Sequence, residues 1–142
     1  MRNVSQILEH KGKEIITVGE HTPVLEAIRL MAEHHVGAVL VMDGERLIGI
    51  ISERDYARKV ILQGRASSDT PVSVVMSAPV ICVSPIDSVN DCMSIMTDRH
   101  IRHLPVIEAE RVVGLVSIGD LVKDLIEEQK QEISLLQQYI SS

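Results

Sequence analysis

The first half of the chain begins with a β-branched run followed by an amphipathic segment. The run EIITV, residues 14–18, is typical of a strand. Residues 22–35 have the pattern of a helix, with Thr22 predicted as its N-cap and Pro23 as its first helical residue. The apolar side chains that recur at helical spacing in this segment are Leu25, Ile28 and Met31. We therefore expect a strand followed by a helix.

Two further apolar runs and a second helical segment complete this half. The runs cover residues 36–42 and 47–53, and the turn between them contains Asp43 and Gly44, a strong hairpin signal. A helical pattern returns in residues 54–62. The predicted order of elements is strand, helix, strand, strand and helix.

The second half repeats this pattern. A shift of 65 residues, which carries Gly49 onto Gly114, aligns the two halves without a gap. It places Ile16, Val18, Val24, Met31, His35, Val41, Glu45, Arg46, Ser52 and Asp55 on Ile81, Val83, Val89, Met96, His100, Val106, Glu110, Arg111, Ser117 and Asp120. The chain is therefore an internal duplication, in which residues 80–83 are expected to form the first strand of the second copy.

The duplication sets the expected domain organisation. The Gly-, Ser- and Pro-rich stretch between the halves predicts a loop, a one-turn helix and a second loop. Because a unit of roughly 60 residues buries little surface alone, the copies are expected to pack about a pseudo-twofold axis. We expect an α+β protein with a first repeat and its N-terminal segment, a connector, a second repeat and a helical extension, at residues 1–64, 65–79, 80–127 and 128–142.

Composition narrows the class of function. The chain has 45% hydrophobic and 24% charged residues, as globular proteins do, and its net charge of −6 disfavours nucleic acid or an acidic membrane as partner. It shows neither a signal-peptide pattern nor a run of about 18 apolar residues, so a cytoplasmic protein is expected. Cys82 and Cys92 lack C-x-x-C spacing and are expected to be reduced, mostly buried thiols.

A Ser-x-x-Asp corner recurs in GIISERD and GLVSIGD. It consists of Ser52 and Asp55 in the first copy and of Ser117 and Asp120 in the second. A strand that ends in this way and starts a helix presents backbone N–H groups, a hydroxyl and a carboxylate, which are groups that bind phosphate and ribose. The alternative is that each serine and aspartate form only a capping box, although glutamate is the usual partner in that motif.

The duplication, together with the segments TPVLEA, IRHLPVIE and VVGLVSIGDLV, resembles a tandem pair of CBS domains (cystathionine β-synthase domains), called a Bateman module. The resemblance covers residues from about Val4 to Glu127. It implies a stand-alone module whose two repeats associate through their sheets and hold adenine nucleotides in the clefts between them. It also implies that the serine and aspartate of each corner contact ribose and phosphate.

The resemblance further implies which residues surround the ligand. The adenine slot of the Asp120 site would comprise Thr17, Val18, Thr22, Ala27, Val36 and Gly37, and that of the Asp55 site Cys82, Val83, Asp87, Cys92 and Ile101. The positions that match phosphate-contacting residues are Arg54, Arg102 and His103. The two sites are not expected to be equivalent, because none of these three basic residues recurs at its repeat position. The alternative for most slot residues is a place in the hydrophobic core.

The six histidines do not predict a metal site, because no His-x3-His pair with an acidic partner occurs. His35 and His100 occupy the same repeat position, which indicates a structural role at a helix end.

The last predicted helix continues beyond the repeat. Its core-type positions alternate spacings of four and three, at Val122, Ile126, Gln129, Ile133, Leu136 and Ile140. This heptad seam predicts docking on a second copy and hence a homodimer, which the resemblance also favours. The alternative is a helix that lies on its own module with a frayed end.

The sequence as a whole favours a non-catalytic sensor that binds an adenine nucleotide and signals to an unknown effector protein. AMP is the expected ligand, with ADP, ATP, NAD or S-adenosylmethionine as alternatives. A ligand-free dimerisation scaffold is the second hypothesis. A nucleotide-processing enzyme is the third, and it is disfavoured because no activated nucleophile, Gly-rich phosphate loop or ligand cluster is visible.

Overall fold

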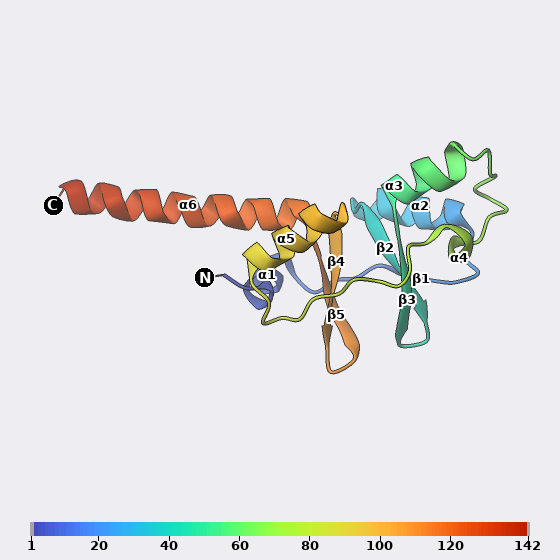
Figure 1. Ribbon diagram of the computed structural model, residues 1–142, viewed down its shortest axis with the longest axis horizontal. Coiled ribbons are helices and arrows are strands. Elements are labelled where there is room, and N and C mark those ends of the chain that lie inside the picture. Colours follow the sequence, from blue (N-terminus) through green and yellow to red (C-terminus); the bar gives the residue numbers. More distant parts are fainter. Residues whose placement is uncertain (1, 142) are drawn as a thin grey trace. The chain divides into compact units, whose positions relative to one another are not determined.

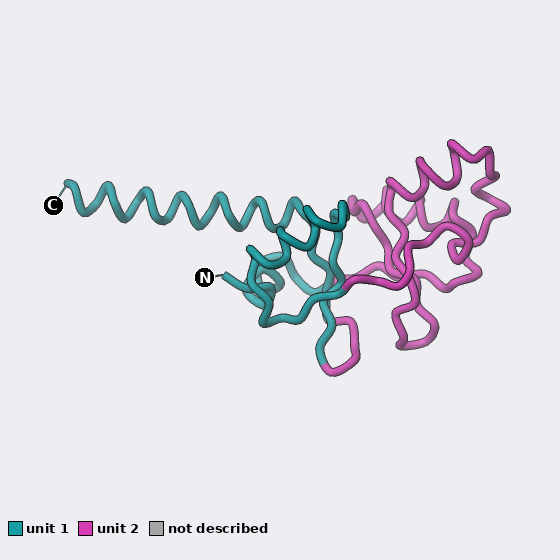
Figure 2. The backbone as a smooth tube through the Cα atoms, in the orientation of Figure 1, with its two compact units in different colours: residues 1–13, 82–108, 113–142 teal, residues 14–81, 109–112 magenta. Residues whose placement is uncertain are grey.

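The computed structural model describes residues 2–141 and divides into two compact units (Figures 1 and 2). Unit 1 comprises Met1–Lys13, Cys82–Glu108 and Val113–Ser142, and unit 2 comprises Glu14–Ile81 and Ala109–Val112. Helices and strands alternate in both, so the predicted α+β class is confirmed.

Unit 2 contains a three-stranded sheet in the order β1-β2-β3. β1 (Thr17–Gly19) pairs in parallel with β2 (Ala38–Asp43), and β2 pairs in antiparallel fashion with β3 (Arg46–Ser52). The predicted hairpin between β2 and β3 is confirmed, and Gly44 supplies the positive φ of 62° that its turn needs. The sheet ends at Ser52, the first residue of the predicted corner.

The helices of unit 2 bury its aliphatic core. α2 (Val24–His34) connects β1 to β2, while α3 (Glu53–Asp55) follows β3 and continues into the π-helical segment η1 (Tyr56–Ile61). The predicted one-turn helix of the connector is α4 (Val72–Val75). Together with the sheet, these elements bury Val18, Val24, Ala27, Met31, Val39, Val41, Ile51, Val60, Val72 and Val75.

Unit 1 has a smaller sheet and longer helices (Figure 1). α1 (Val4–Lys11) precedes the first repeat, and α5 (Val89–Arg99) is the counterpart of α2. β4 (His103–Glu108) and β5 (Arg111–Ser117) form a two-stranded sheet, and α6 (Ile118–Ser141) follows β5 directly. None of the helices in residues 2–141 combines the length and apolar composition needed to cross a membrane.

The predicted strand at residues 80–83 is wrong, because only its last residue forms a bridge, opposite Val106. In the first repeat, the N–H of Leu40 donates to the carbonyl of Ile16 (3.0 Å). The repeat position of Leu40 is held by Pro105, which has no N–H to donate. The proline therefore removes one of the hydrogen bonds that would pair residues 80–83 with β4 as a full strand.

α2 begins one residue later than predicted. Pro23 has extended backbone (φ −62°, ψ 143°) and is the N-cap, so Val24 is the first helical residue. The hydroxyl of Thr22 accepts a hydrogen bond from the N–H of Gly19 (3.2 Å). Thr22 therefore stabilises the turn before the helix and does not cap it.

The predicted structural role of the two repeated histidines is confirmed. His35 ends α2 and His100 ends α5, both in the left-handed conformation, with φ of 54° and 55°. The N–H of His35 donates to the carbonyl of Met31, as in an αL cap.

α4 joins unit 2 through its first turn. The N–H of Val72 donates to the carbonyl of Thr22 (2.8 Å), and the N–H of Val24 donates to the carbonyl of Thr70 (2.8 Å). The starts of α2 and α4 are therefore held together by a reciprocal pair of backbone hydrogen bonds.

α1 joins unit 1 by the same pair of bonds. The N–H of Val4 donates to the carbonyl of Asp87 (2.9 Å), and the N–H of Val89 donates to that of Arg2 (3.1 Å). α1 thus has in unit 1 the role that α4 has in unit 2. The 65-residue repeat does not predict α1, because the counterpart of α1 lies 68 residues further on, from Val4 to Val72.

Two repeated glycines allow these helices to approach the sheets. A Cβ at Gly114 in β5 would lie 2.7 and 2.9 Å from the methyl groups of Leu8 in α1. A Cβ at Gly49 in β3 would lie 2.8 Å from Cγ of Met76, just after α4, and would overlap its sulfur. Leu8, Gly49 and Gly114 are buried, so neither contact has room for a methyl group without a shift of side chain or backbone.

We expect Gly49→Ala and Gly114→Ala each to lower the free energy of unfolding by about 1–3 kcal/mol through overpacking. Gly19→Ala is the matched control, because the nearest atom to its Cβ would be 3.8 Å away, an ordinary contact. Denaturant unfolding measures all three. An unchanged midpoint for Gly114→Ala would contradict the close packing of α1 on β5.

Cys92 belongs to the core of unit 1. It is fully buried on α5, and burial together with the carboxylates of Asp87 and Asp91 raises the pKa of its thiol to about 11. Burial also raises the pKa of the half-buried Cys82 thiol. The thiolate is the reactive form of cysteine, so the structure disfavours chemistry at either residue.

We therefore expect Cys92 to resist a thiol reagent such as DTNB at pH 8 in the folded protein and to react at once after unfolding. Because the buried thiol stays protonated while the thiol of the unfolded chain ionises, the free energy of unfolding should fall as the pH rises from the ordinary pKa of 9.0 towards about 11. Labelling followed by peptide mapping distinguishes Cys92 from Cys82. Rapid labelling of Cys92 in folded protein would show that α5 does not bury it.

Candidate functional site

The first Ser-x-x-Asp corner lies where β3 ends and α3 begins. Ser52 has extended backbone (φ −118°, ψ 169°) and is the N-cap of α3. Its Oγ accepts the N–H of Asp55 (3.3 Å), and Oδ2 of Asp55 accepts the N–H of Ser52 (2.9 Å). The capping box is therefore confirmed at this corner, and aspartate is long enough to close it.

The other oxygen of Asp55 has donors from the rest of unit 2. The Ser77 hydroxyl lies 3.2 Å from Oδ1, and Nζ of Lys59 lies 3.1 Å from the same oxygen. Lys59 also donates to the carbonyl of Val75 (3.0 Å). Both oxygens of this carboxylate, whose side chain is 13% exposed, are thus engaged within the unit.

The second corner repeats the box at the start of α6. Oδ2 of Asp120 accepts the N–H of Ser117 (2.8 Å), and the Ser117 hydroxyl accepts the N–H of Asp120 (3.2 Å). The capping box therefore forms in both copies. Whether the same groups also bind a ligand stays a prediction.

Lys11, the last residue of α1, makes the two corners different. Its Nζ donates to Oδ2 of Asp120 (2.6 Å) and to the carbonyl of Leu115 (2.6 Å). Within unit 1, the N–H of Ser117 and the ammonium of Lys11 both donate to Oδ2 of Asp120, and neither of them donates to Oδ1. The sequence does not predict the role of Lys11, because nothing in the repeat pattern places α1 beside this corner.

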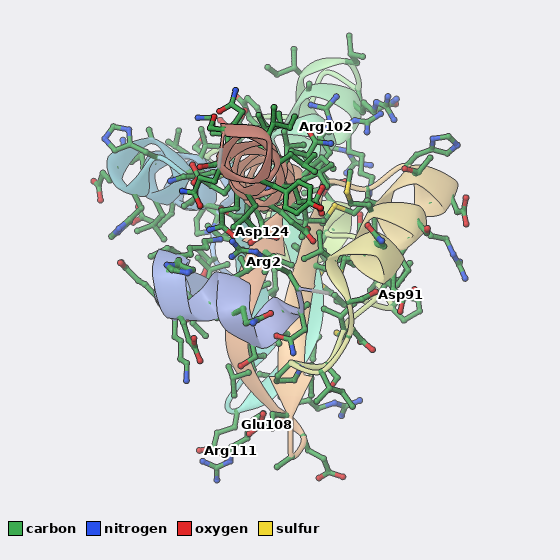
Figure 3. All side chains as sticks on the ribbon, turned by 90° about the vertical axis from the view of Figure 1, so that its left-hand side faces the viewer. Arg2, Asp91, Arg102, Glu108, Arg111 and Asp124 are labelled. Atoms are coloured by element: carbon green, nitrogen blue, oxygen red, sulfur yellow. The ribbon has the colours of Figure 1, made fainter. Side chains whose placement is uncertain are left out.

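A further backbone bond ties each corner to the loop before the hairpin of its own repeat. The N–H of Glu53 donates to the carbonyl of Gly37 (3.0 Å), and the N–H of Ile118 donates to that of Arg102 (2.9 Å). The structure therefore brings Arg102, labelled in Figure 3, to the Asp120 corner of its own repeat. The Asp55 corner has a glycine at this position and receives no cation from it.

The predicted ligand residues divide between the units. Unit 2 contains Thr17, Val18, Thr22, Ala27, Val36, Gly37, Ser52, Arg54 and Asp55, and unit 1 contains Cys82, Val83, Ile101, Arg102, His103, Ser117 and Asp120. Val18, Ala27 and Val83 are at most 9% exposed and belong to the core, and a contact of these residues with a ligand stays a prediction. Thr17 and Arg102 are exposed, and the other predicted residues, Gly37 among them, are half-buried. The predicted pairing of the corner of one repeat with the slot of the other stays a prediction.

A groove of about 600 Å³ opens beside Asp120 between α1 and α6. It is lined by Arg2, Ile7, His10, Lys11, Asp120, Lys123, Asp124, Glu127 and Gln131. Arg2 and Asp124 meet within it in an ion pair of 3.2 Å (Figure 3). Oδ2 of Asp124 is buried and accepts no hydrogen bond from the residues that the structure describes. The surroundings of Asp120 are therefore polar, with basic groups from both helices.

The described residues do not assemble a metal centre. Between residues 2 and 141, no three His, Cys, Asp or Glu side chains come together as metal ligands.

The CBS domain family model matches the chain twice, at residues 4–62 and 72–127. These matches begin at Val4 and Val72, the first residues of α1 and α4. In the family model each copy therefore begins with a helix: α1 begins the first copy but packs on the sheet of the second, and α4 begins the second copy but packs on the sheet of the first.

Curated relatives carry the same domain. The CBS domain-containing protein CBSX3, mitochondrial, of Arabidopsis thaliana is 40% identical over 146 residues, which cover 96% of this chain and 71% of that protein. The CBS domain-containing protein YhcV of Bacillus subtilis is 35% identical over 118 residues, which cover 83% of this chain and 84% of that protein.

Solved structures have the same fold. A candidate signal-transduction protein with CBS domains from Burkholderia ambifaria is 48% identical, with a TM-score of 0.87 over 90% of this chain and 96% of that one. The CBS domain pair of protein MJ0100, in complex with 5′-methylthioadenosine and S-adenosyl-L-methionine, is 25% identical, with a TM-score of 0.80 over 90% of this chain and 98% of that one. With two matches to the domain and this likeness over nearly its whole length, the chain belongs to the CBS domain family, as a tandem CBS pair.

Proposed function

We propose that this CBS pair is a regulatory, non-catalytic module that binds an adenine nucleotide through its Ser-x-x-Asp corners, with AMP as the expected ligand. The observation that carries the proposal is the Asp120 corner, where a helix N-terminus, a hydroxyl and a carboxylate lie together. The two ligands named for MJ0100 support an adenosine ligand, because both contain adenosine and differ from AMP at the 5′ position.

The hydrogen bonds rank the two corners. Ribose offers two hydroxyl donors, and a carboxylate offers two acceptor oxygens. At Asp120, the Lys11 ammonium and the Ser117 N–H both donate to Oδ2, and neither occupies Oδ1, which a ribose hydroxyl could therefore reach. At Asp55 a ribose would have to displace Ser77 or Lys59 from Oδ1. We therefore place the tighter site at Asp120.

The charges near Asp120 favour a ligand with a phosphate. Lys11 donates to the carboxylate, Arg102 is joined to the corner through its carbonyl, and Lys123 lines the adjoining groove. Cations placed beside a helix N-terminus, which itself carries a partial positive charge, are suited to a phosphate. AMP, ADP, ATP and NAD carry this group, whereas S-adenosylmethionine does not, which is why AMP leads the proposal.

A ligand-free scaffold is the second candidate. It is supported by the capping boxes, which already give both serines and both aspartates a role in starting α3 and α6. Under either candidate we propose that the protein acts in the cytoplasm, assembles as a homodimer and signals to an effector protein of unknown identity.

The proposal is tested by thermal unfolding of ligand-stripped protein with AMP, ADP, ATP, NAD, S-adenosylmethionine and 5′-methylthioadenosine, with GMP as control. At about 100 times its dissociation constant, a ligand should stabilise the fold by about 2.7 kcal/mol, a rise in Tm of several degrees. We expect the adenine ligands to raise Tm, GMP to leave it unchanged, and AMP to be recovered intact. No rise with any ligand would favour the scaffold, and turnover of nucleotide would favour an enzyme.

The corner variants need a control for the loss of a cap, because Asp120→Ala removes half of a capping box. Ser88→Ala provides it: Ser88 caps α5 by accepting the N–H of Asp91 (3.0 Å) and lies outside both corners. Each variant should lower stability by about 1 kcal/mol.

We expect Asp120→Ala to lower the affinity for AMP at least tenfold and Ser88→Ala to leave it unchanged. Asp55→Ala is expected to affect it less. Equal AMP responses in Asp120→Ala and Ser88→Ala would overturn the assignment of the ribose to Asp120.

A further inference from the structure

The second half of α6 makes no burying contact within its unit. Leu121 and Asp124 are buried in the first turns of the helix, but every residue from Gln129 to Ser141 is exposed. In Figure 1 this part of α6 runs on beyond α1 and α5 of the same unit. Within unit 1, residues 129–141 therefore do not pack as the alternative of a helix lying on its own module requires. A helical segment this short is marginal in water unless an apolar face is covered.

The exposed apolar face has the composition of a two-stranded coiled coil. In heptad notation, the a positions are Ile126, Ile133 and Ile140. The d positions are Val122, Gln129 and Leu136. All of the apolar members are at least 41% exposed, and Ile140 is 80% exposed. β-branched residues at a with leucine at d favour parallel dimers over higher oligomers, and here all three a positions are isoleucine while one d position, Leu136, is leucine.

Gln129 indicates which helix covers this face. An unpaired amide in an apolar layer loses its hydrogen bonds to water, whereas a second amide opposite it can replace them. In a parallel, in-register pair, Gln129 faces the partner's Gln129. In an antiparallel pair over the same seam, Gln129 of each chain faces Ile133 of the other, so an amide lies against an apolar side chain in two layers. A foreign apolar helix would leave the amide equally unpaired.

The charges beside the seam favour the same arrangement. An antiparallel pair would bring Lys130 close to the partner's Lys130 and Glu132 close to the partner's Glu132, because like heptad positions then flank each other. A parallel pair places Lys130 near the partner's Leu125 and Glu132 near the partner's Gln137. It therefore avoids both like-charge contacts.

We propose that α6 binds α6 of a second copy as a parallel, in-register, two-stranded coiled coil that extends over Val122–Ile140. This seam is about 27 Å long, or roughly two and a half heptads, so we expect a dimer that dissociates on dilution. The inference stands independently of the proposed ligand, because none of its residues belongs to a Ser-x-x-Asp corner.

Two neighbouring leucines give a matched pair of variants for the full-length protein. Leu136 is in the seam, whereas Leu135 is outside it, and their exposures are 61% and 64%. In sedimentation velocity over a range of concentrations, Leu136→Glu should weaken dimerisation at least tenfold, and Leu135→Glu should behave like wild type. Circular dichroism checks that both variants remain folded. A wild-type protein that is monomeric throughout, or equal effects of the two variants, would overturn the proposal.

Disulfide trapping tests the orientation. In the double variant Val122→Cys, Ile140→Cys, mild oxidation of a parallel dimer should join each new cysteine to its own counterpart. Peptide mapping would then find 122–122 and 140–140 bridges. A 122–140 bridge would show an antiparallel pair and overturn the proposal. Wild-type protein, which retains Cys82 and Cys92, is the control for the native thiols.

Discussion

The close packing of a short helix on a glycine is the contact on which each unit depends. Leu8 of α1 lies against Gly114 in β5, and Met76, just after α4, lies against Gly49 in β3. A methyl group at either glycine would overlap the Leu8 or Met76 side chain, so that side chain or the nearby backbone would have to shift. Because α1 precedes the first repeat but packs on the second, each copy of the duplication is completed by a helix that lies outside the aligned repeat.

The same packing determines the chemistry of the corners. The segment after α4 brings the Ser77 hydroxyl to Asp55, whereas the end of α1 brings the Lys11 ammonium to Asp120. The two corners have the same capping box, yet their carboxylates receive different donors on different oxygens. The duplicated motif has thus become two unequal corners, and the difference comes from segments that lie outside the motif itself.

α6 connects the proposed site with the inferred dimer. Its first turn contains Asp120; Leu121 and Asp124 pack within unit 1, and the exposed seam runs along another face of the helix from Val122 to Ile140. A helix is stiff along its axis, so under the proposed function a ligand bound beside α1 and the first turn would alter the position of the seam. Assembly of two copies would then be one way to transmit occupancy of the Asp120 corner.

The local parts of this structure were determined by the sequence alone. The duplication, the order of elements, the β2-β3 hairpin and the long last helix follow from periodicity and turn residues, and the capping box follows from a spacing of three. The tertiary structure decided what depends on distant segments: the packing of α1 on the second repeat, the ion pair of Lys11 with Asp120, and the single bridge left opposite Pro105. These contacts join residues with no shared local pattern, so only folding of the chain could show which donor meets which carboxylate.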